Sequence, residues 1–439
     1  MSIKSIKIKN LLSFDELIIN DFKNINCIVG RNNSGKSNLL KLIRFFYHKL
    51  EDKRELPPTL NSKYSTFGTI TIIYDTSRIK QNFKKFLKNI LKNNTIPLVK
   101  KENINEFRIG KSYFYELRDN NDLLSIPKNI NIAFQRNIPL NNAVVSFRKN
   151  KSYLDLFEPH SKNYYFLRLD IKAFFHSIEA RDIKDIFSSY FEDNHMDDDK
   201  KQTLINAFIN IVTYIVPNDS PNEDFRGKKI LPMGFVTSPV VSNIVFRKID
   251  IQIQKFCAQH NIVYTRYADD MLFSSTKNSR YIHSDGFINE ISILVSQMKF
   301  KLNQHKTLKS THTLSLNGYT IQYSNIRKDI LGGRDEKIIN EFRLSNKKIN
   351  IIKKMIHFIE TEKQTPRYIL QKLFNYQLSP DVPIEKQEEY YKHQLSNKLT
   401  GYRSYLLSFV IFDKKYGCMQ KVTIKKYIEL IEKLNENIL

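Results

Sequence analysis

The sequence predicts an α+β chain, with a small α/β module before an antiparallel sheet and a helical C-terminal region. Three observations support this fold class: a glycine-rich phosphate-binding motif at residues 30–37, an Asp-Asp pair between two β-prone runs, and apolar residues at helical spacing after Gly318. The module is expected over residues 1–95.

Composition favours a protein that binds a polyanion. The chain has 439 residues, 41% of them hydrophobic, which is enough for two or three domains with sizeable cores. Seventy Lys and Arg residues against 45 Asp and Glu residues leave a formal charge of +25, so binding that weakens with salt is expected. Three scattered cysteines favour a reducing cytoplasm over disulfides or zinc. No apolar run approaches a membrane span and no signal-peptide pattern opens the chain, so a cytoplasmic protein without a membrane partner is predicted.

The N-terminal module carries a complete G-x-x-x-x-G-K-S motif. Strands are predicted at residues 3–10, at 18–19, at 25–29 just before the motif, and at 68–75. Helical spacing follows the motif, which is the context such a loop requires. Glycines let backbone amides wrap a phosphate, while Lys36 would reach the β and γ phosphates and Ser37 would hold Mg²⁺. The residues expected to bind ATP are Gly30, Asn32, Gly35, Lys36 and Ser37.

The surroundings of this motif resemble the N-terminal half of ATPases of the structural-maintenance-of-chromosomes and overcoming-lysogenization-defect kind. The resemblance stops near residue 95, and no apolar strand ending in Asp-Glu follows. Hydrolysis therefore lacks the groups that position a metal ion and a water molecule. A truncated P-loop module is predicted that binds nucleotide, docks on a separately encoded ATPase, or braces the region after it. A remnant that keeps only the shape of the loop is the alternative.

Two adjacent acids, Asp269 and Asp270, lie between the β-prone runs 262–264 and 271–273. These flanks predict a tight hairpin with the acids at its tip. Because side chains alternate along a strand, both acids point the same way only if the turn rotates one of them, and Asp269 is favoured as the primary metal ligand. Repulsion makes the pair costly without a cation, and oxygen ligands suit Mg²⁺. A solvated Asp-Asp turn is the alternative.

A third acid, Asp170, ends the apolar strand predicted at 164–169. The chain between Asp170 and Asp269 is long enough for a helical crossover and a return to the same sheet. If the chain returns in this way, Asp170 would join Asp269 and Asp270 at the predicted Mg²⁺ site.

Six sequence blocks resemble, in the same order, the palm of bacterial reverse transcriptases, especially the retron and phage-defence groups. They are Ser146–Ser152, Pro159–His160, Leu169–Ile178, Leu231–Pro239, Tyr267–Asp270 and Leu302–Thr307. The resemblance covers roughly residues 140–435. It implies a right-hand polymerase with fingers over 96–160, a palm with an antiparallel sheet over 161–315 and a helical, nucleic-acid-binding thumb over 316–439. It also implies RNA-templated DNA synthesis from dNTPs on a cognate noncoding RNA in antiphage defence.

The resemblance assigns further residues to this site. The carbonyl of Ile171 would complete the triphosphate-side metal site. An aromatic ring at Phe175 would collide with a 2′-hydroxyl, which favours a DNA product, unless Phe174 and Phe175 both belong to the core. Lys306 would protonate the pyrophosphate leaving group, help worth about 10²–10⁴-fold, with a structural lysine as the alternative. The residues expected to contact the dNTP are Ile171, Phe175, Met233, Gly234, Arg148 and Lys151, with Met233 standing where most relatives have Gln.

Other polar residues are expected to be structural or solvated. His160, His176 and His305 are interpreted as structural, and the acidic tract 192–199 as a solvated loop with helix caps.

The C-terminal region is expected to be helical beyond Gly318. Ile338, Phe342, Ile349, Ile352, Met355, Ile356 and Ile359 recur at helical spacing. Lys347, Lys348, Lys353 and Lys354 lie between them, which suits a thumb helix along the backbone of an RNA/DNA product duplex. An ordinary amphipathic surface helix is the alternative. A basic helix near 421–436 resembles the end of the retron thumb, where the structured RNA is held.

Two blocks depart from the retron pattern, at Leu156–His160 and Leu316–Gly318, so neighbouring defence-associated reverse transcriptases stay open. Two other functions also stay open. One is a template-independent or protein-primed DNA polymerase of the abortive-infection type, and the other is a nucleotide-gated nucleic-acid-binding module that recruits an effector protein. An oligomer is compatible with each.

Overall fold

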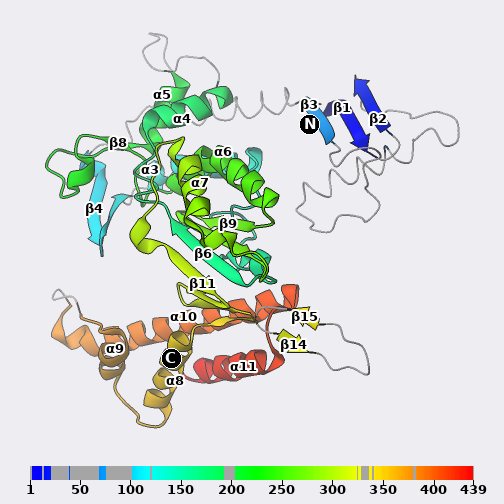
Figure 1. Cartoon of the computed structure of the whole chain (residues 1–439). Helices are drawn as coiled ribbons and strands as arrows, with labels where there is room; N and C mark the ends of the chain where they lie inside the picture. The colour runs from blue at the N-terminus through cyan, green and yellow to red at the C-terminus, as the bar shows by residue number, and fades with distance from the viewer. Residues whose placement is uncertain are drawn as a thin grey trace. The chain divides into compact units, whose positions relative to one another are not determined.

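The computed structural model describes residues 2–11, 14–20, 39, 69–75, 101–118, 121–191, 203–323, 325–327, 336–338, 341–378 and 382–438. The chain divides into two compact units, whose elements are labelled in Figure 1. The first comprises residues 1–142 and 179–238, and the second residues 143–178 and 239–439. Residues 143–160, expected in the fingers, therefore fold with the second unit, and residues 179–238, expected in the palm, fold with the first.

The N-terminal strands of the first unit form an antiparallel sheet in the order β2-β1-β3. They are β1 (Ser2–Leu11), β2 (Phe14–Asn20) and β3 (Thr69–Asp75). Ile6 and Ile8 are buried while Lys7 between them is exposed, as alternation along a strand requires. The strands predicted at 3–10, 18–19 and 68–75 are thus confirmed over the described residues of each. The strand predicted at 25–29 and the motif with Gly30, Asn32, Gly35, Lys36 and Ser37 lie outside the described residues.

The other described residues of the first unit form two short strand pairs and three α-helices. The elements are β4 (Ile104–Ile109), β5 (Ser112–Leu117), α3 (Asn121–Asn137), α4 (Ala180–Phe187), α5 (Leu204–Val212), β7 (Tyr214–Ile215) and β8 (Lys229–Ile230). Rings of Phe134, Phe187 and Phe208 pack with centroids 5.1–5.4 Å apart and join the three helices. Pro127 lies inside α3.

The loop before α6 depends on a glycine. The Tyr115 amide donates a hydrogen bond to the Met233 carbonyl at 2.8 Å, which brings β5 against residues 233–234. Gly234 has φ +111°, and a Cβ atom there would lie 2.4 Å from the Tyr115 carbonyl oxygen. This approach of two backbones is possible only without a side chain.

The second unit is built on a four-stranded antiparallel sheet in the order β11-β6-β10-β9. Its strands are β6 (Tyr165–Asp170), β9 (Val263–Tyr267), β10 (Asp270–Ser275) and β11 (Leu308–Thr311). Every residue of β10 is buried. The predicted hairpin and the predicted strand ending in Asp170 are confirmed. The helices that accompany the sheet in sequence are α6 (Ser238–Gln259) and α7 (Asp285–Ser296).

Short strands follow the palm sheet, where a helix was predicted. They are β12 (Thr313–Leu316), β13 (Tyr319–Gln322), β14 (Asn325–Arg327), β15 (Glu336–Ile338) and β16 (Glu341–Leu344). The prediction of helix directly after Gly318 is therefore wrong. Ile338 and Phe342 lie four residues apart, which imitates a helical repeat, but Phe342 and Leu344 are buried on alternate positions of a strand.

In the described part of the second unit, four α-helices follow from residue 346 onward, so the helical structure predicted for the C-terminal region is confirmed there (Figure 1). They are α8 (Asn346–Glu360), α9 (Pro366–Phe374), α10 (Gln387–Tyr416) and α11 (Lys421–Glu436). Ile349, Ile352, Met355 and Ile356 form the buried face of α8, as predicted. One hydrophobic core connects these helices with Phe166 of β6 and Leu272 of β10.

Cys257 and Cys418 are buried and free. Within the described ranges, no helix combines the length and the apolar character that crossing a membrane requires.

We expect Gly234→Ala to lower the midpoint of thermal unfolding by several degrees. The added methyl group would meet the Tyr115 carbonyl oxygen, and alanine is strained at φ +111° by roughly 1–3 kcal/mol. Gly401→Ala is the matched control, because nothing lies within 4 Å of its Cβ position inside α10. Alanine should stabilise that helix by about 0.5–1 kcal/mol. Equal midpoints for Gly234→Ala and the wild type in differential scanning calorimetry would contradict the proposed role of the close approach.

Candidate active site

The three acids come together because β6 pairs with β10. In the antiparallel register, Asp170 stands opposite Asp270. The chain then continues past the strand end, where the Ile171 amide donates a hydrogen bond to the Asp269 carbonyl oxygen at 3.1 Å. Asp170 and the Asp-Asp pair, far apart in sequence, thus lie at one end of one sheet.

The adjacent acids Asp269 and Asp270 lie in different parts of the β9–β10 hairpin. Tyr267 of β9 pairs with Asp270 of β10, which leaves Ala268 and Asp269 as the turn. Ala268 adopts φ +54°. Asp270 accepts a hydrogen bond from Arg168 Nε at 2.7 Å, whereas Asp269 is half-buried in the turn. Rotation by the turn therefore gives the neighbouring carboxylates different surroundings.

Asp170 is buried, with 1% of its surface exposed, and lies among cationic and amide donors. Lys306 Nζ is 2.9 Å from its Oδ2, and Asn303 Nδ2 donates to Oδ1 at 3.2 Å. Arg168 Nη2 lies 3.6 Å from Oδ2. Lys306, predicted at this site from its sequence block, is thus in contact with a predicted catalytic acid.

Burial and like charge make Asp269 a weak acid. The pKa of Asp269 is raised to about 6, first by desolvation and then by the negative charges of Asp270 and Asp170. Burial also raises the pKa of Asp270, although the charge of Arg168 opposes this shift. Ionisation of Asp269 therefore costs more free energy than ionisation of an ordinary exposed aspartate.

Sequence reasoning missed Arg168, which contacts both Asp170 and Asp270. A signal was present, since Arg168 precedes Asp170 by two residues in a predicted strand and shares its face. Its contact with Asp270 depends on the register of β6 with β10, which sequence alone did not reveal.

Sequence reasoning also missed Tyr153, which packs beside the Asp-Asp turn. Its ring packs on Tyr267 with centroids 4.8 Å apart and on Tyr319 at 4.9 Å, and Asn317 Nδ2 donates to its hydroxyl at 2.8 Å. Burial, and then the charge of Asp270, raises the pKa of Tyr153. The Asp-Asp turn is therefore joined by aromatic packing to the β12–β13 hairpin.

The two candidate phenylalanines differ in burial. Phe174 is 3% exposed and packs on Phe246 and Phe300, so its expected place in the core is confirmed. Phe175 is half-buried. The chain leaves the strand after Asp170 and turns at Ala173, which has φ +48°, so the difference does not arise from alternation along a strand.

The other predicted dNTP contacts are divided between the two units. In the second, Arg148 Nη1 donates to the Val144 carbonyl at 3.0 Å, and Lys151 Nζ lies 3.7 Å from Asp155. Met233 and Gly234 belong to the first unit.

The histidines at positions 160 and 176 fit structural roles. His160 is buried, with ring nitrogens 2.5 Å from Ser274 Oγ and 2.8 Å from Thr265 Oγ1. Burial lowers the pKa of His176 to about 4, which keeps that ring neutral at physiological pH. The acidic tract 192–199 lies outside the described residues.

Within the part of the chain that the structure describes, no group of three or more His, Cys, Asp or Glu side chains has the arrangement of a metal site. Asp170 and Asp270 instead face Lys306 and Arg168. The donors nevertheless suit Mg²⁺ chemically, because they are carboxylate oxygens. Burial and then mutual repulsion raise the pKa of Asp269, and a cation would relieve that repulsion.

The lysines of α8 form an exposed basic face. Lys347, Lys353 and Lys354 are exposed, whereas Lys348 is half-buried with its Nζ 5.8 Å from the centroid of the Tyr402 ring. The predicted division of this helix into an apolar face and a lysine face is confirmed.

Comparison with known proteins identifies the family. A family model described as reverse transcriptase (RNA-dependent DNA polymerase) matches residues 100–321. The Retron Ec73 reverse transcriptase of Escherichia coli is 31% identical over 175 residues, which are 38% of this chain and 52% of that protein. The Retron Ec83 reverse transcriptase of Escherichia coli is 25% identical over 243 residues, covering 53% of this chain and 74% of that protein. The chain thus spans about half the length of the first of these relatives.

Among solved structures, the chain matches an apo telomerase from Candida tropicalis, truncated from its C-terminal domain. It is 14% identical in sequence and has a TM-score of 0.34, over 58% of this chain and 60% of that one.

We expect Asp269→Asn to raise the unfolding midpoint of the metal-free protein at pH 8 by a few degrees. The folded state binds the Asp269 proton more tightly than the unfolded chain does, because the pKa rises from 3.8 to about 6 on folding. The proton therefore stabilises the fold at pH 4 and below, and that contribution is lost as pH rises through about 6. Asparagine cannot ionise and avoids the loss.

The measurement is thermal unfolding in EDTA at pH 4.5 and pH 8. The advantage of Asp269→Asn should shrink at the lower pH, and the exposed Asp224→Asn should match the wild type at both. A midpoint for Asp269→Asn at or below that of the wild type at pH 8 would show that Asp269 is not under electrostatic strain.

Proposed function

Because the chain belongs to the reverse transcriptase (RNA-dependent DNA polymerase) family, we propose that it synthesises DNA from dNTPs on an RNA template. The pairing of β6 with β10 is the observation that carries this proposal, since it places Asp170 opposite Asp270 with Asp269 in the adjoining turn. Three acids at one sheet end are the set that nucleotidyl transfer with divalent cations requires.

In this proposal, Asp170 and Asp269 hold two Mg²⁺ ions, Asp270 assists, and the Ile171 carbonyl contributes a further oxygen. When bound, the cations lower the pKa of the primer 3′-hydroxyl and carry the charge of the triphosphate. Lys306 is 2.9 Å from Asp170 and 52% exposed, so its ammonium group can serve as the proton donor to the pyrophosphate. Arg168 orients Asp270 through its guanidinium group.

Half-burial of Phe175 supports its proposed role as the residue that excludes a 2′-hydroxyl. A fully enclosed ring such as that of Phe174 could not reach a sugar. The further dNTP contacts proposed are Arg148, Lys151, Met233 and Gly234.

A cognate noncoding RNA as template and a role in antiphage defence are proposed from the resemblance of the sequence blocks to the retron and phage-defence groups. Similarity to enzymes named retron reverse transcriptases is compatible with the first of these. ATP binding at Gly30–Ser37, and a separately encoded ATPase or effector partner, are proposed from the sequence motif alone.

A primer-extension assay with purified protein tests the proposal. On a defined RNA template with an annealed DNA primer, we expect a complementary DNA product that requires Mg²⁺ and uses dNTPs in preference to NTPs. Asp269→Asn should reduce the rate by at least about 10³-fold, since the variant loses one ligand of both cations. Lys36→Ala should leave extension unchanged while abolishing binding of ATP.

Each other outcome favours a different function. A homopolymer or random strand favours the template-independent or protein-primed enzyme. Full antiphage activity in an Asp269→Asn, Asp270→Asn variant, together with its loss in Lys36→Ala, favours the nucleotide-gated module. Incorporation of NTPs as readily as dNTPs would remove the proposed role of Phe175.

We also expect the exposed lysines of α8 to bind the product duplex. A triple variant with Lys347→Gln, Lys353→Gln and Lys354→Gln should bind the duplex more weakly. The slope of the logarithm of its binding constant against the logarithm of the salt concentration should fall in magnitude by up to about 0.9 per contacting lysine. The control variant, Lys248→Gln, Lys255→Gln, Lys277→Gln, removes the same charge from exposed palm positions. Equal salt slopes for both variants in fluorescence anisotropy would favour an ordinary solvated helix.

A further inference from the structure

The turn that carries Asp269 has a strained backbone. Ala268 adopts φ +54°, and a left-handed conformation costs a non-glycine residue roughly 1–2 kcal/mol. Such a conformation persists only where the surroundings impose it. Ala268 is buried, so those surroundings are protein groups.

Two buried side chains hold the peptide groups on either side of Ala268. Ser146 Oγ accepts a hydrogen bond from the Ala268 amide at 3.0 Å, and Arg266 Nη1 donates to the Ala268 carbonyl oxygen at 2.8 Å. Ser146 and Arg266 are both fully buried. Together they determine the orientation of the backbone from which Asp269 projects.

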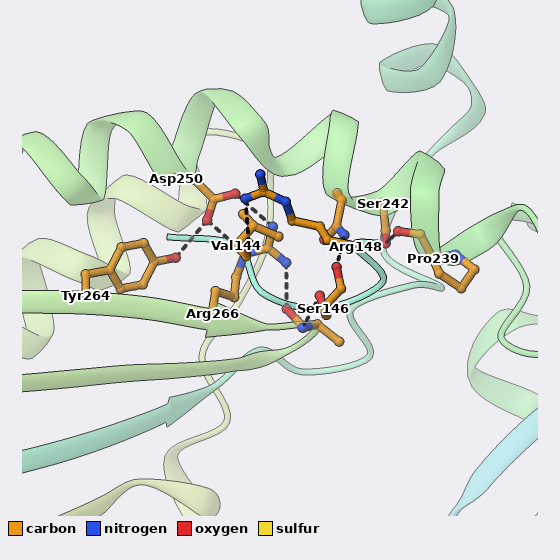
Figure 2. A network of polar contacts seen from close by, with 10 residues as sticks. Val144, Ser146, Arg148, Pro239, Ser242, Asp250, Tyr264 and Arg266 are labelled. Carbon is orange, nitrogen blue, oxygen red and sulfur yellow. Dashed lines mark hydrogen bonds and ion pairs between the residues drawn. The ribbon is translucent and has the colours of Figure 1, made fainter. Parts of the chain in front are cut away.

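Arg266 can position the turn because it is itself fixed (Figure 2). Its Nε and Nη2 donate to the two oxygens of Asp250 on α6, each at 2.8 Å, and its guanidinium carbon lies 4.6 Å from the centroid of the Phe246 ring. Its backbone pairs with residues 143–145, through Arg266 N to Ala143 O at 2.7 Å and Val145 N to Arg266 O at 2.9 Å.

Stability alone does not account for this arrangement. A fully buried ion pair often contributes no more to stability than apolar side chains of the same volume. The planar guanidinium group, however, can bind a carboxylate with two N–H groups and still present a third to a carbonyl, which a lysine ammonium cannot reproduce with the same geometry.

We propose that Arg266, fixed by Asp250, is a positioning residue that together with Ser146 holds the Ala268–Asp269 turn in its catalytic conformation. This inference rests on the proposed polymerase function of Asp269. Arg266 acts through the backbone of the turn and touches neither substrate nor cation.

The test compares Arg266→Lys and Ser146→Ala with Tyr264→Phe. Arg266→Lys keeps a charge beside Asp250 but loses the bond to Ala268, and Ser146→Ala removes the other bond to the turn and leaves the ion pair intact. Tyr264→Phe is the matched control, because the Tyr264 hydroxyl donates to Asp250 at 2.8 Å without contacting the turn. Ser146→Ala and Tyr264→Phe each remove one buried hydrogen bond, whereas Arg266→Lys also loses the two-point contact of the guanidinium group with Asp250.

For Arg266→Lys and Ser146→Ala, we expect kcat to fall at least tenfold while the KM for dNTP and the affinity for duplex stay within about twofold. Hydrogen exchange of residues 267–270 should accelerate at least tenfold. Tyr264→Phe should lower the unfolding midpoint but leave kcat and exchange at the turn unchanged. Adding Ala268→Gly to Arg266→Lys should restore kcat at least threefold, because glycine adopts positive φ without steric cost.

The inference is overturned if Arg266→Lys and Ser146→Ala behave like Tyr264→Phe, with lower stability but unchanged kcat and turn exchange. If Arg266→Lys fails to fold, Ser146→Ala decides. A wild-type protein that extends no primer would refute the proposed function, and exchange at residues 267–270 would still decide whether Arg266 and Ser146 hold the turn.

Discussion

Asp170 and Asp270 occupy opposite positions of β6 and β10, at the end of a sheet whose strand β10 is buried throughout. Two unit charges about 5 Å apart repel by roughly 3 kcal/mol at an effective dielectric constant near 20. Arg168 and Lys306 lie beside these carboxylates and offset much of that repulsion. The third acid, Asp269, has a raised pKa, which shows that its ionisation remains unfavourable. Antiparallel pairing thus creates the candidate site and concentrates its electrostatic strain.

Backbone strain and electrostatic strain meet at the same turn. Ala268 is held at positive φ next to Asp269, whose pKa is raised. The hydrophobic core that spans the β6–β10 pair and the four C-terminal helices provides the compensating stability. Conformational and electrostatic strain at a site supported by a large core is the pattern expected where function, not stability, selects the residues.

The sequence predicted this region well where the signals were local. Apolar runs around Asp269 and Asp270 indicated the hairpin, and the acid after residues 164–169 indicated the end of β6. The helix predicted from the spacing of Ile338 and Phe342 is wrong, because apolar residues four positions apart occur in strands as well as in helices. Arg168 and Arg266 could not be assigned because their partners, Asp270 and Asp250, are set by strand register and helix packing. Phe175 lies in an irregular turn, where no periodic pattern predicts which way a side chain faces.

The cationic side chains around the turn differ in burial, and the difference fits two separate roles, one structural and one electrostatic. Arg266 has no exposed side-chain surface and is paired with an equally buried Asp250, so exchanging that partner would leave a charge unpaired in the interior. Arg168 and Lys306 are 20% and 52% exposed, so water can replace their contacts with Asp270 and Asp170 at much lower cost. A polymerase must keep the backbone of its acids still while charges enter and leave with every nucleotide. The buried Arg266 suits the task of holding the backbone still, and the partly exposed Arg168 and Lys306 suit the task of balancing a changing charge. The charge at the carboxylates can therefore change without movement of the turn that carries Asp269.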